Sequence, residues 1–181
     1  MSMATSASRA DTSAAPASIE AKKVVVVGSV SSGKSALVQR AVTNTYTNQY
    51  LQTFGADLCV KTTSEKNKSS LKIWCCGGHE RYRALLQQFF VGASAVILCF
   101  DMLNTSSFQE LPFWYNEFKR ICPDALAVMV GTKSDDADGI KVPVQDALKQ
   151  AKEWSIDFRA VSAKTGMNVS ELFDHITTSM P

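Results

Sequence analysis

The sequence lacks a disulfide framework, a long apolar run and a marked excess of either charge. Its five cysteines are an odd number without regular spacing, which argues against a secreted, disulfide-held domain and favours a reducing compartment. The longest apolar run, around 93–100, is far shorter than the roughly 20 residues of a membrane helix. Lys and Arg number 19 against 17 for Asp and Glu, so we expect no nucleic acid among the partners and a cytoplasmic location.

The length and composition predict one globular domain. The chain has 181 residues, of which 45% are hydrophobic and 20% charged. Residues 1–21 are mostly Ala, Ser and Thr, with Ile19 as the one branched aliphatic residue, and we expect a disordered tail there. A transit peptide is a weaker alternative because Asp11 and Glu20 are acidic. The folded domain is predicted to span 22–181.

Short apolar runs alternate with helical patterns along this domain. The runs at 24–27, 95–100 and 125–130 suit strands that are buried on both faces, and 156–159 is a shorter strand. Helical spacing follows at 35–42, 107–121, 144–154 and 169–178, with Pro112 favouring a helix start near Leu111. Residues 58–60 and 71–74 flank a polar turn at 64–70. The sequence therefore predicts an α/β fold, a mostly parallel six-stranded sheet with one antiparallel edge strand and helices on both faces.

A glycine-rich turn joins the first apolar run to the first helical pattern. It reads Gly28-Ser-Val-Ser-Ser-Gly33-Lys34-Ser35, the G-x-x-x-x-G-K-S pattern of a phosphate-binding loop. Backbone N–H groups and the helix N-terminus of such a loop point at phosphate oxygens. Lys34 would place a cation on the β- and γ-phosphates, and the Ser35 hydroxyl can ligate Mg²⁺. The motif predicts a nucleoside triphosphate without specifying its base.

Two polar segments that follow strands indicate the base. Thr132-Lys133-Ser-Asp135 follows the third apolar run, and Ser162-Ala163-Lys164 follows the short strand. In open α/β sheets, ligands bind at the carboxyl ends of strands. The Asp135 carboxylate can accept hydrogen bonds from N1–H and the 2-amino group of guanine, a pair that adenine lacks. These segments argue against the alternative of an ATP-using P-loop enzyme such as a small kinase.

These motifs resemble those of a Ras-superfamily small GTPase, most closely the Rab branch, over about 22–181. Ile73-Trp74, Gly78 and Glu80-Arg81-Tyr82 match the Rab-type second switch. The resemblance implies a single P-loop G domain that binds GTP or GDP with Mg²⁺ and acts as a molecular switch in membrane traffic or transport-complex regulation. It assigns to the nucleotide Gly28, Ser31, Ser32, Gly33, Lys34, Ser35, Ala36, Tyr46, Thr53, Gly78, Thr132, Lys133, Asp135, Ser162, Ala163 and Lys164.

The resemblance also implies individual roles. Tyr46 would stack on the guanine, and Thr53 would ligate Mg²⁺ together with Ser35. Three positions near the γ-phosphate depart from the family pattern. Cys75 replaces the aspartate that holds the Mg²⁺ shell, and a neutral thiol is a poor partner for that hard ion. His79 replaces the glutamine that orients the attacking water, and Val30 brings a β-branched side chain where Gly or Ser is usual.

The departures predict slow intrinsic hydrolysis and weakened Mg²⁺ affinity, with His79 as the candidate catalytic residue. One alternative is a nucleotide-bound scaffold that does not hydrolyse, a pseudo-GTPase, for example in an intraflagellar transport complex. Another is neutral drift, with hydrolysis rescued by an activating protein. Zinc ligation by Cys75, Cys76 and His79 is a poor interpretation because adjacent cysteines rarely chelate one ion well.

The Rab resemblance implies protein partners. Its effector-docking cluster falls on Leu58, Trp74 and Phe89, with Trp74 expected at a partly exposed surface and Leu58 equally compatible with the core. An exchange factor and an activating protein are implied as well. The last cysteine is Cys122, so no C-terminal lipid anchor is expected. The protein would be cytoplasmic, peripheral to a membrane or part of a flagellar or transport complex.

Overall fold

The computed structural model describes residues 21–62 and 70–180. The predicted tail at 1–21 lies outside this part of the chain except for Ala21, which begins the first strand. Most of the predicted turn at 64–70 also lies outside the described residues. Within the described ranges, no helix combines the length and the apolar character needed to cross a membrane.

A six-stranded sheet forms the centre of the molecule, in the order β2-β3-β1-β4-β5-β6. Neighbouring strands are parallel except β2 and β3, which pair antiparallel from Ala56 opposite Cys76 to Thr62 opposite Ser70. The predicted sheet with one antiparallel edge strand is therefore confirmed. The strands are β1 (Ala21–Val27), β2 (Ala56–Thr62), β3 (Ser70–Cys76), β4 (Ala95–Asp101), β5 (Leu126–Thr132) and β6 (Asp157–Ala160).

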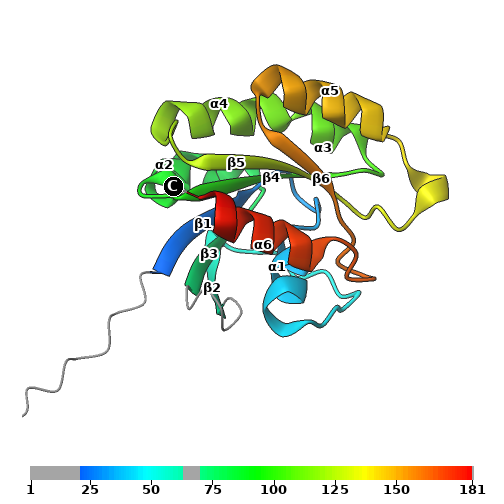
Figure 1. Cartoon of the computed structure of the whole chain (residues 1–181), viewed down its shortest axis with the longest axis horizontal. Helices are drawn as coiled ribbons and strands as arrows, with labels where there is room; N and C mark the ends of the chain where they lie inside the picture. Colours follow the sequence, from blue (N-terminus) through cyan, green and yellow to red (C-terminus); the bar gives the residue numbers. More distant parts are fainter. Residues whose placement is uncertain (1–20, 63–69, 181) are drawn as a thin grey trace, which may run out of the picture.

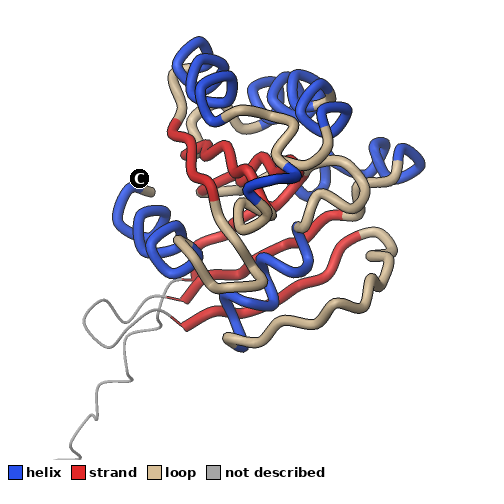
Figure 2. The backbone as a smooth tube through the Cα atoms, turned by 90° about the vertical axis from the view of Figure 1, so that its right-hand side faces the viewer, coloured by secondary structure: helices blue, strands red, loops and turns tan. Residues whose placement is uncertain are grey.

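Helices cover both faces of the sheet, as predicted. Figure 1 shows α1 and α6 on one face and α3, α4 and α5 on the other, and Figure 2 shows the strands running between these helical layers. The helices are α1 (Lys34–Thr43), α2 (Leu86–Phe90), α3 (Thr105–Gln109), α4 (Leu111–Ile121), α5 (Val144–Trp154) and α6 (Val169–Ser179), with 3₁₀ turns η1 (Glu80–Leu85) and η2 (Ala137–Gly139).

The two layers explain why the central strands are continuously apolar. Successive side chains of a strand point to opposite faces. Val24 and Val26 of β1 pack in the core cluster shared with α1 and α6, and Val25 and Val27 pack in the cluster shared with α2, α4 and α5. A strand buried on both faces has no place for an alternating polar residue.

The helical pattern predicted at 107–121 is divided in the structure. The main helix begins at Leu111 with Pro112 in its first turn, as predicted, because proline needs no N–H partner there. A separate five-residue helix, α3, precedes it. The Asn104 side chain caps α3 by accepting a hydrogen bond from the Ser106 N–H at 3.0 Å. The short elements α3, η1, α2 and η2 were not predicted as separate elements, since one or two turns carry too little periodicity.

The parallel topology brings several loops to one edge of the sheet. β1 leads into the glycine-rich loop before α1, β3 leads into 77–79, and β5 and β6 lead into the segments after 132 and 160. The long loop 44–55 leaves α1 and runs into β2 (Figure 2). All the predicted nucleotide residues lie in or beside these loops, which is the place where such sheets bind ligands.

Candidate nucleotide-binding site

Two adjoining cavities lie at the carboxyl edge of the sheet. One of 580 Å³ lies between the glycine-rich loop, the loop 44–55 and 76–79, and one of 500 Å³ lies over the segments after β5 and β6. Both are lined by Gly33, Ala36, Tyr46, Asn48 and Lys133, which makes one continuous trough. The predicted residues on its walls are Ser31, Gly33, Lys34, Ser35, Ala36, Tyr46, Thr53, Gly78, Thr132, Lys133, Asp135, Ala163 and Lys164.

The other three predicted residues stand behind the walls and shape them. Gly28 has a φ of 143°, and a Cβ there would meet the Cys99 carbonyl oxygen at 2.1 Å, so only glycine fits. The Ser32 carbonyl accepts a hydrogen bond from the Thr132 hydroxyl at 2.9 Å. The Ser162 hydroxyl is buried and donates to the Asp135 carboxylate at 2.7 Å.

The Lys34 ammonium is held inside its own loop. It donates to the carbonyl oxygens of Gly28 at 2.9 Å and Ser29 at 2.7 Å. Burial lowers the pKa of Lys34, with nearby thiols acting in the opposite sense. Neutral carbonyls are weaker acceptors than an anionic oxygen. The loop therefore presents a desolvated cation that an incoming phosphate can satisfy better than its present partners.

Two hydroxyls and a thiol meet at the start of α1. Ser35 Oγ lies 3.1 Å from Thr53 Oγ1 and 3.6 Å from Cys75 Sγ. Burial is the main cause that raises the pKa of Cys75 above its usual value, while the Ser35 hydroxyl and Lys34 act to lower it. Cys75 is therefore a neutral thiol near pH 7. The paired hydroxyl oxygens suit a hard cation such as Mg²⁺, and the thiol does not.

The segment after β3 lies directly against the glycine-rich loop. A Cβ on Gly78 would meet the Ser29 carbonyl carbon at 2.5 Å, so glycine is required at this contact. His79 faces the larger cavity, and its Nδ1 accepts a hydrogen bond from the Arg81 N–H at 3.3 Å. The neutral ring consequently carries its proton on Nε2. Val30 lines the same cavity and is 42% exposed.

On the opposite side of the trough, the polar side chains hold one another. Asp135 Oδ1 accepts from Ser162, and its Oδ2 lies 3.7 Å from Lys164 Nζ. Lys133 Nζ pairs with Asp101 Oδ2 at 2.5 Å. The Thr132 hydroxyl also lies 3.1 Å from the Phe100 carbonyl. The Asp135 carboxylate is thus oriented in advance at the wall of the smaller cavity.

Comparison with known proteins identifies the family. The family model described as the Ras family matches residues 23–181. This chain belongs to the Ras family. It is also similar to Ras-related protein RABF2b of Arabidopsis thaliana, with 35% identity over 161 residues that cover 88% of this chain and 80% of the relative. The resemblance to a Rab-like small GTPase of the Ras superfamily is confirmed.

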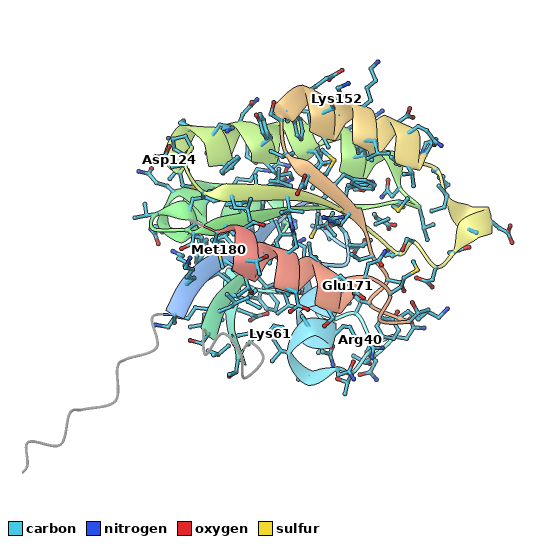
Figure 3. The ribbon with its side chains drawn as sticks, viewed as in Figure 1. Arg40, Lys61, Asp124, Lys152, Glu171 and Met180 are labelled. Atoms are coloured by element: carbon cyan, nitrogen blue, oxygen red, sulfur yellow. The ribbon has the colours of Figure 1, made fainter. Side chains whose placement is uncertain are left out.

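Three residues beside the site of this Ras-family chain were missed by sequence reasoning. Arg40 of α1 donates from Nε to the Ala163 carbonyl at 2.6 Å and from a terminal nitrogen to the Lys164 carbonyl at 2.8 Å, which fixes the loop after β6 (Figure 3). Glu110 joins Ser29 to Arg83. Asp57 lines the larger cavity. The contacts of Arg40 and Glu110 are long-range, the place of Asp57 depends on the pairing of β2 with β3, and no local pattern in the sequence indicates any of them.

The link through Glu110 connects two functional loops of this Ras-family domain. Glu110 Oε2 accepts from the Ser29 hydroxyl at 2.9 Å and from Arg83 at 3.1 Å. The Arg83 guanidinium also lies over the Phe113 ring, 4.3 Å from its centroid. The glycine-rich loop and η1 are therefore tied to the start of α4.

The cluster assigned to effectors is contiguous in the structure. Leu58 stands opposite Trp74 across β2 and β3, and the rings of Trp74 and Phe89 are 5.8 Å apart. Trp74 and Phe89 are half-buried, and Leu58 is 50% exposed, so core packing is excluded for Leu58. Further exposed apolar side chains in the loop 44–55 and in β2 are Tyr50, Leu51, Phe54 and Val60.

Proposed function

We propose that this chain is a guanine-nucleotide switch that binds GTP and GDP with Mg²⁺ and hydrolyses GTP slowly. Its place of action would be membrane traffic or the regulation of a transport complex, in the cytoplasm, peripheral to a membrane or within a flagellar complex. The observation that carries the proposal is one trough with a buried lysine in a phosphate-binding loop at one end and a pre-oriented aspartate at the other.

Different residues of the trough would bind different parts of the nucleotide. Backbone N–H groups of 31–36 and the Lys34 ammonium would hold the phosphates. Asp135 would accept from the guanine edge while Ser162 and Lys164 keep its carboxylate in place. Tyr46 lines both cavities and would cover the base. The hydroxyls of Ser35 and Thr53 would hold Mg²⁺, which would supply charge neutralisation for the phosphates.

Three side chains support slow hydrolysis. Val30 lines the larger cavity, where its β-branched side chain would crowd an attacking water. His79 has one ring nitrogen engaged with Arg81, which leaves Nε2–H as a donor rather than an acceptor toward that water. Cys75 offers no charge to the ion. Among the described residues, no hydrogen bond or ion pair joins these three side chains to Asp135, Ser162 or Lys164, so binding would persist.

A single-turnover assay with saturating Mg²⁺ tests the proposal. We expect the purified protein to retain guanine nucleotide and to hydrolyse bound GTP much more slowly than an ordinary Rab protein measured alongside. Retained ATP would overturn guanine specificity, and an empty protein that takes up no nucleotide would overturn binding. A rate equal to that of the Rab control would overturn slow hydrolysis alone.

A nucleotide-bound scaffold is the second candidate. The neutral Cys75 thiol and the ties from Glu110 to Ser29 and Arg83 favour it, because both weaken the dependence of η1 on the γ-phosphate. Hydrogen exchange in the GTP-bound and GDP-bound protein separates the two. Identical exchange in 44–55 and 77–86 would favour the scaffold, and slower exchange with GTP would favour the switch.

We also propose a surface for an effector at Leu58, Trp74 and Phe89, together with an exchange factor and an activating protein as further partners. An exposed leucine beside two half-buried aromatic rings suits the apolar centre of a protein interface. Replacing Leu58 by Asp is expected to abolish effector capture without altering nucleotide retention. Unchanged capture would place the effector elsewhere.

A further inference from the structure

An acidic residue stands directly opposite the unusual thiol on the neighbouring strand. Asp57 of β2 and Cys75 of β3 are partners in the antiparallel register. Directly opposite residues of such a pair have Cα atoms about 4.5–5.5 Å apart, and their side chains share one face of the sheet. Cys59, two residues further along β2, packs against the core cluster that contains Cys75, which places Asp57 on the same face.

The Asp57 side chain lies at the cavity and is available to a ligand there. It lines the larger cavity together with Ser35 and Thr53. Among the described residues it makes no hydrogen bond and no ion pair, and it is exposed. An exposed carboxylate without a protein partner at the rim of a cavity is available to a cation.

The candidate magnesium ligands lie on the same side as this carboxylate. Ser35 Oγ is 3.6 Å from Cys75 Sγ and 3.1 Å from Thr53 Oγ1, so the thiol, the two hydroxyls and the strand position of Asp57 form one neighbourhood. The negative charge of Asp57 also acts on Cys75, where it favours the neutral thiol. Mg²⁺ keeps several waters in protein sites and is held by one or two carboxylates.

We infer that Asp57 supplies, from β2, the carboxylate of the magnesium site that Cys75 cannot supply from β3. The inference rests on the proposed function, since it assumes nucleotide bound with Mg²⁺. Asp57 would be a positioning residue. It would orient the water shell of the ion rather than touch the reacting atoms. The site would then keep one carboxylate, displaced by one strand.

The test measures nucleotide release as a function of Mg²⁺ and does not depend on hydrolysis. The full chain is loaded with a fluorescent GDP analogue, and its dissociation rate is followed while free Mg²⁺ is varied. Asp57→Asn is expected to raise the Mg²⁺ concentration for half-maximal nucleotide retention about tenfold. Loss of a residue that orients the ligands of a metal ion weakens metal affinity by roughly 10–100-fold. Circular dichroism confirms that the variant folds.

Asp124→Asn is the matched control. Asp124 is an exposed carboxylate in the turn before β5, at the edge of the sheet opposite the trough, and Figure 3 shows it on the other side of the molecule from Arg40. It should leave the Mg²⁺ dependence unchanged. Cys75→Asp should lower the Mg²⁺ requirement. In the Cys75→Asp background, Asp57→Asn should raise the Mg²⁺ concentration for half-maximal retention by less than about threefold, because a carboxylate is again present at position 75.

The outcomes separate the inference from the function on which it rests. A wild-type protein that releases nucleotide equally fast with and without Mg²⁺ would overturn both. A Mg²⁺-dependent wild-type protein with an Asp57→Asn variant within twofold of it would overturn the inference alone. The inference would also be overturned if Asp57→Asn still raised the required Mg²⁺ concentration tenfold in the Cys75→Asp background. The two carboxylates would then not substitute for one another.

Discussion

On the base side of the trough, each polar side chain has a partner that fixes it. Asp135 is held by Ser162, Lys133 by Asp101, and Thr132 by the Ser32 carbonyl. On the γ-phosphate side, Val30 and His79 face the open cavity, and Cys75 is buried and neutral. Under the proposed function, the residues that would recognise the base are fixed before a ligand arrives, whereas those that would act in hydrolysis depart from the family pattern. Base recognition and hydrolysis would then be carried by separate residues that can vary independently.

The largest expected effect breaks the base side. Asp135→Asn removes the acceptor for two guanine donors, and a paired contact of this kind contributes about 1–3 kcal/mol to discrimination. We expect the affinity for GDP to fall on the order of 10- to 100-fold, measured by titration calorimetry. Asp138→Asn, an exposed acid in η2, is the control. An equal loss in the control, or no loss at Asp135, would contradict a pre-oriented base contact.

The next test repairs the γ-phosphate side. The triple change Val30→Gly, Cys75→Asp and His79→Gln should raise the single-turnover hydrolysis rate at least about tenfold, because a water-positioning group and a carboxylate near the ion are restored. The ratio of GDP to ADP affinity should not change, since no base-side residue is touched. A repaired protein as slow as wild type would place the block to hydrolysis elsewhere, and a changed base preference would break the separation of the two sides.

Much of the base side could be predicted from the sequence because its residues are local. Thr132 and Asp135 follow an apolar run whose length indicates a buried strand, Ser162 follows a shorter predicted strand, and parallel topology places the ends of these strands together. The glycine-rich loop is equally local, from Gly28 to Ser35. Fold and site could therefore be placed together from short motifs.

The rest depended on contacts between distant segments. Arg40 reaches the loop after β6, more than 120 residues away, and Glu110 reaches Ser29 at a separation of 81. The proposed role of Asp57 follows only from the strand register that places it opposite Cys75. Side chains of this kind have no fixed spacing from the motif that they support. The orientation of His79 also depends on the turn at the start of η1, which the neighbouring residues do not predict.

A smaller effect is expected where the γ-phosphate side is tied to α4. Glu110→Ala removes the acceptor shared by Ser29 and Arg83, and because the pair is partly exposed it should lower the free energy of unfolding by about 0.5–1 kcal/mol. Hydrogen exchange should become faster in Glu80–Leu85. Glu117→Ala, which breaks the surface pair with Arg120, is the control. Unchanged exchange in η1 would show that Glu110 does not hold it.

The smallest effect concerns the thiols beneath the γ-phosphate side. Burial raises the pKa of Cys76 and of Cys99 to about 12 and raises that of Cys75, so the native state keeps these thiols protonated and unreactive as pH rises from 7 to 9. Iodoacetamide followed by mass spectrometry should label the half-buried Cys59 first and leave Cys75 unlabelled, while urea-unfolded protein should react at all five cysteines. Labelling of Cys75 as fast as Cys59 would reveal a thiolate, which would put negative charge beside Ser35 and remove the need for Asp57.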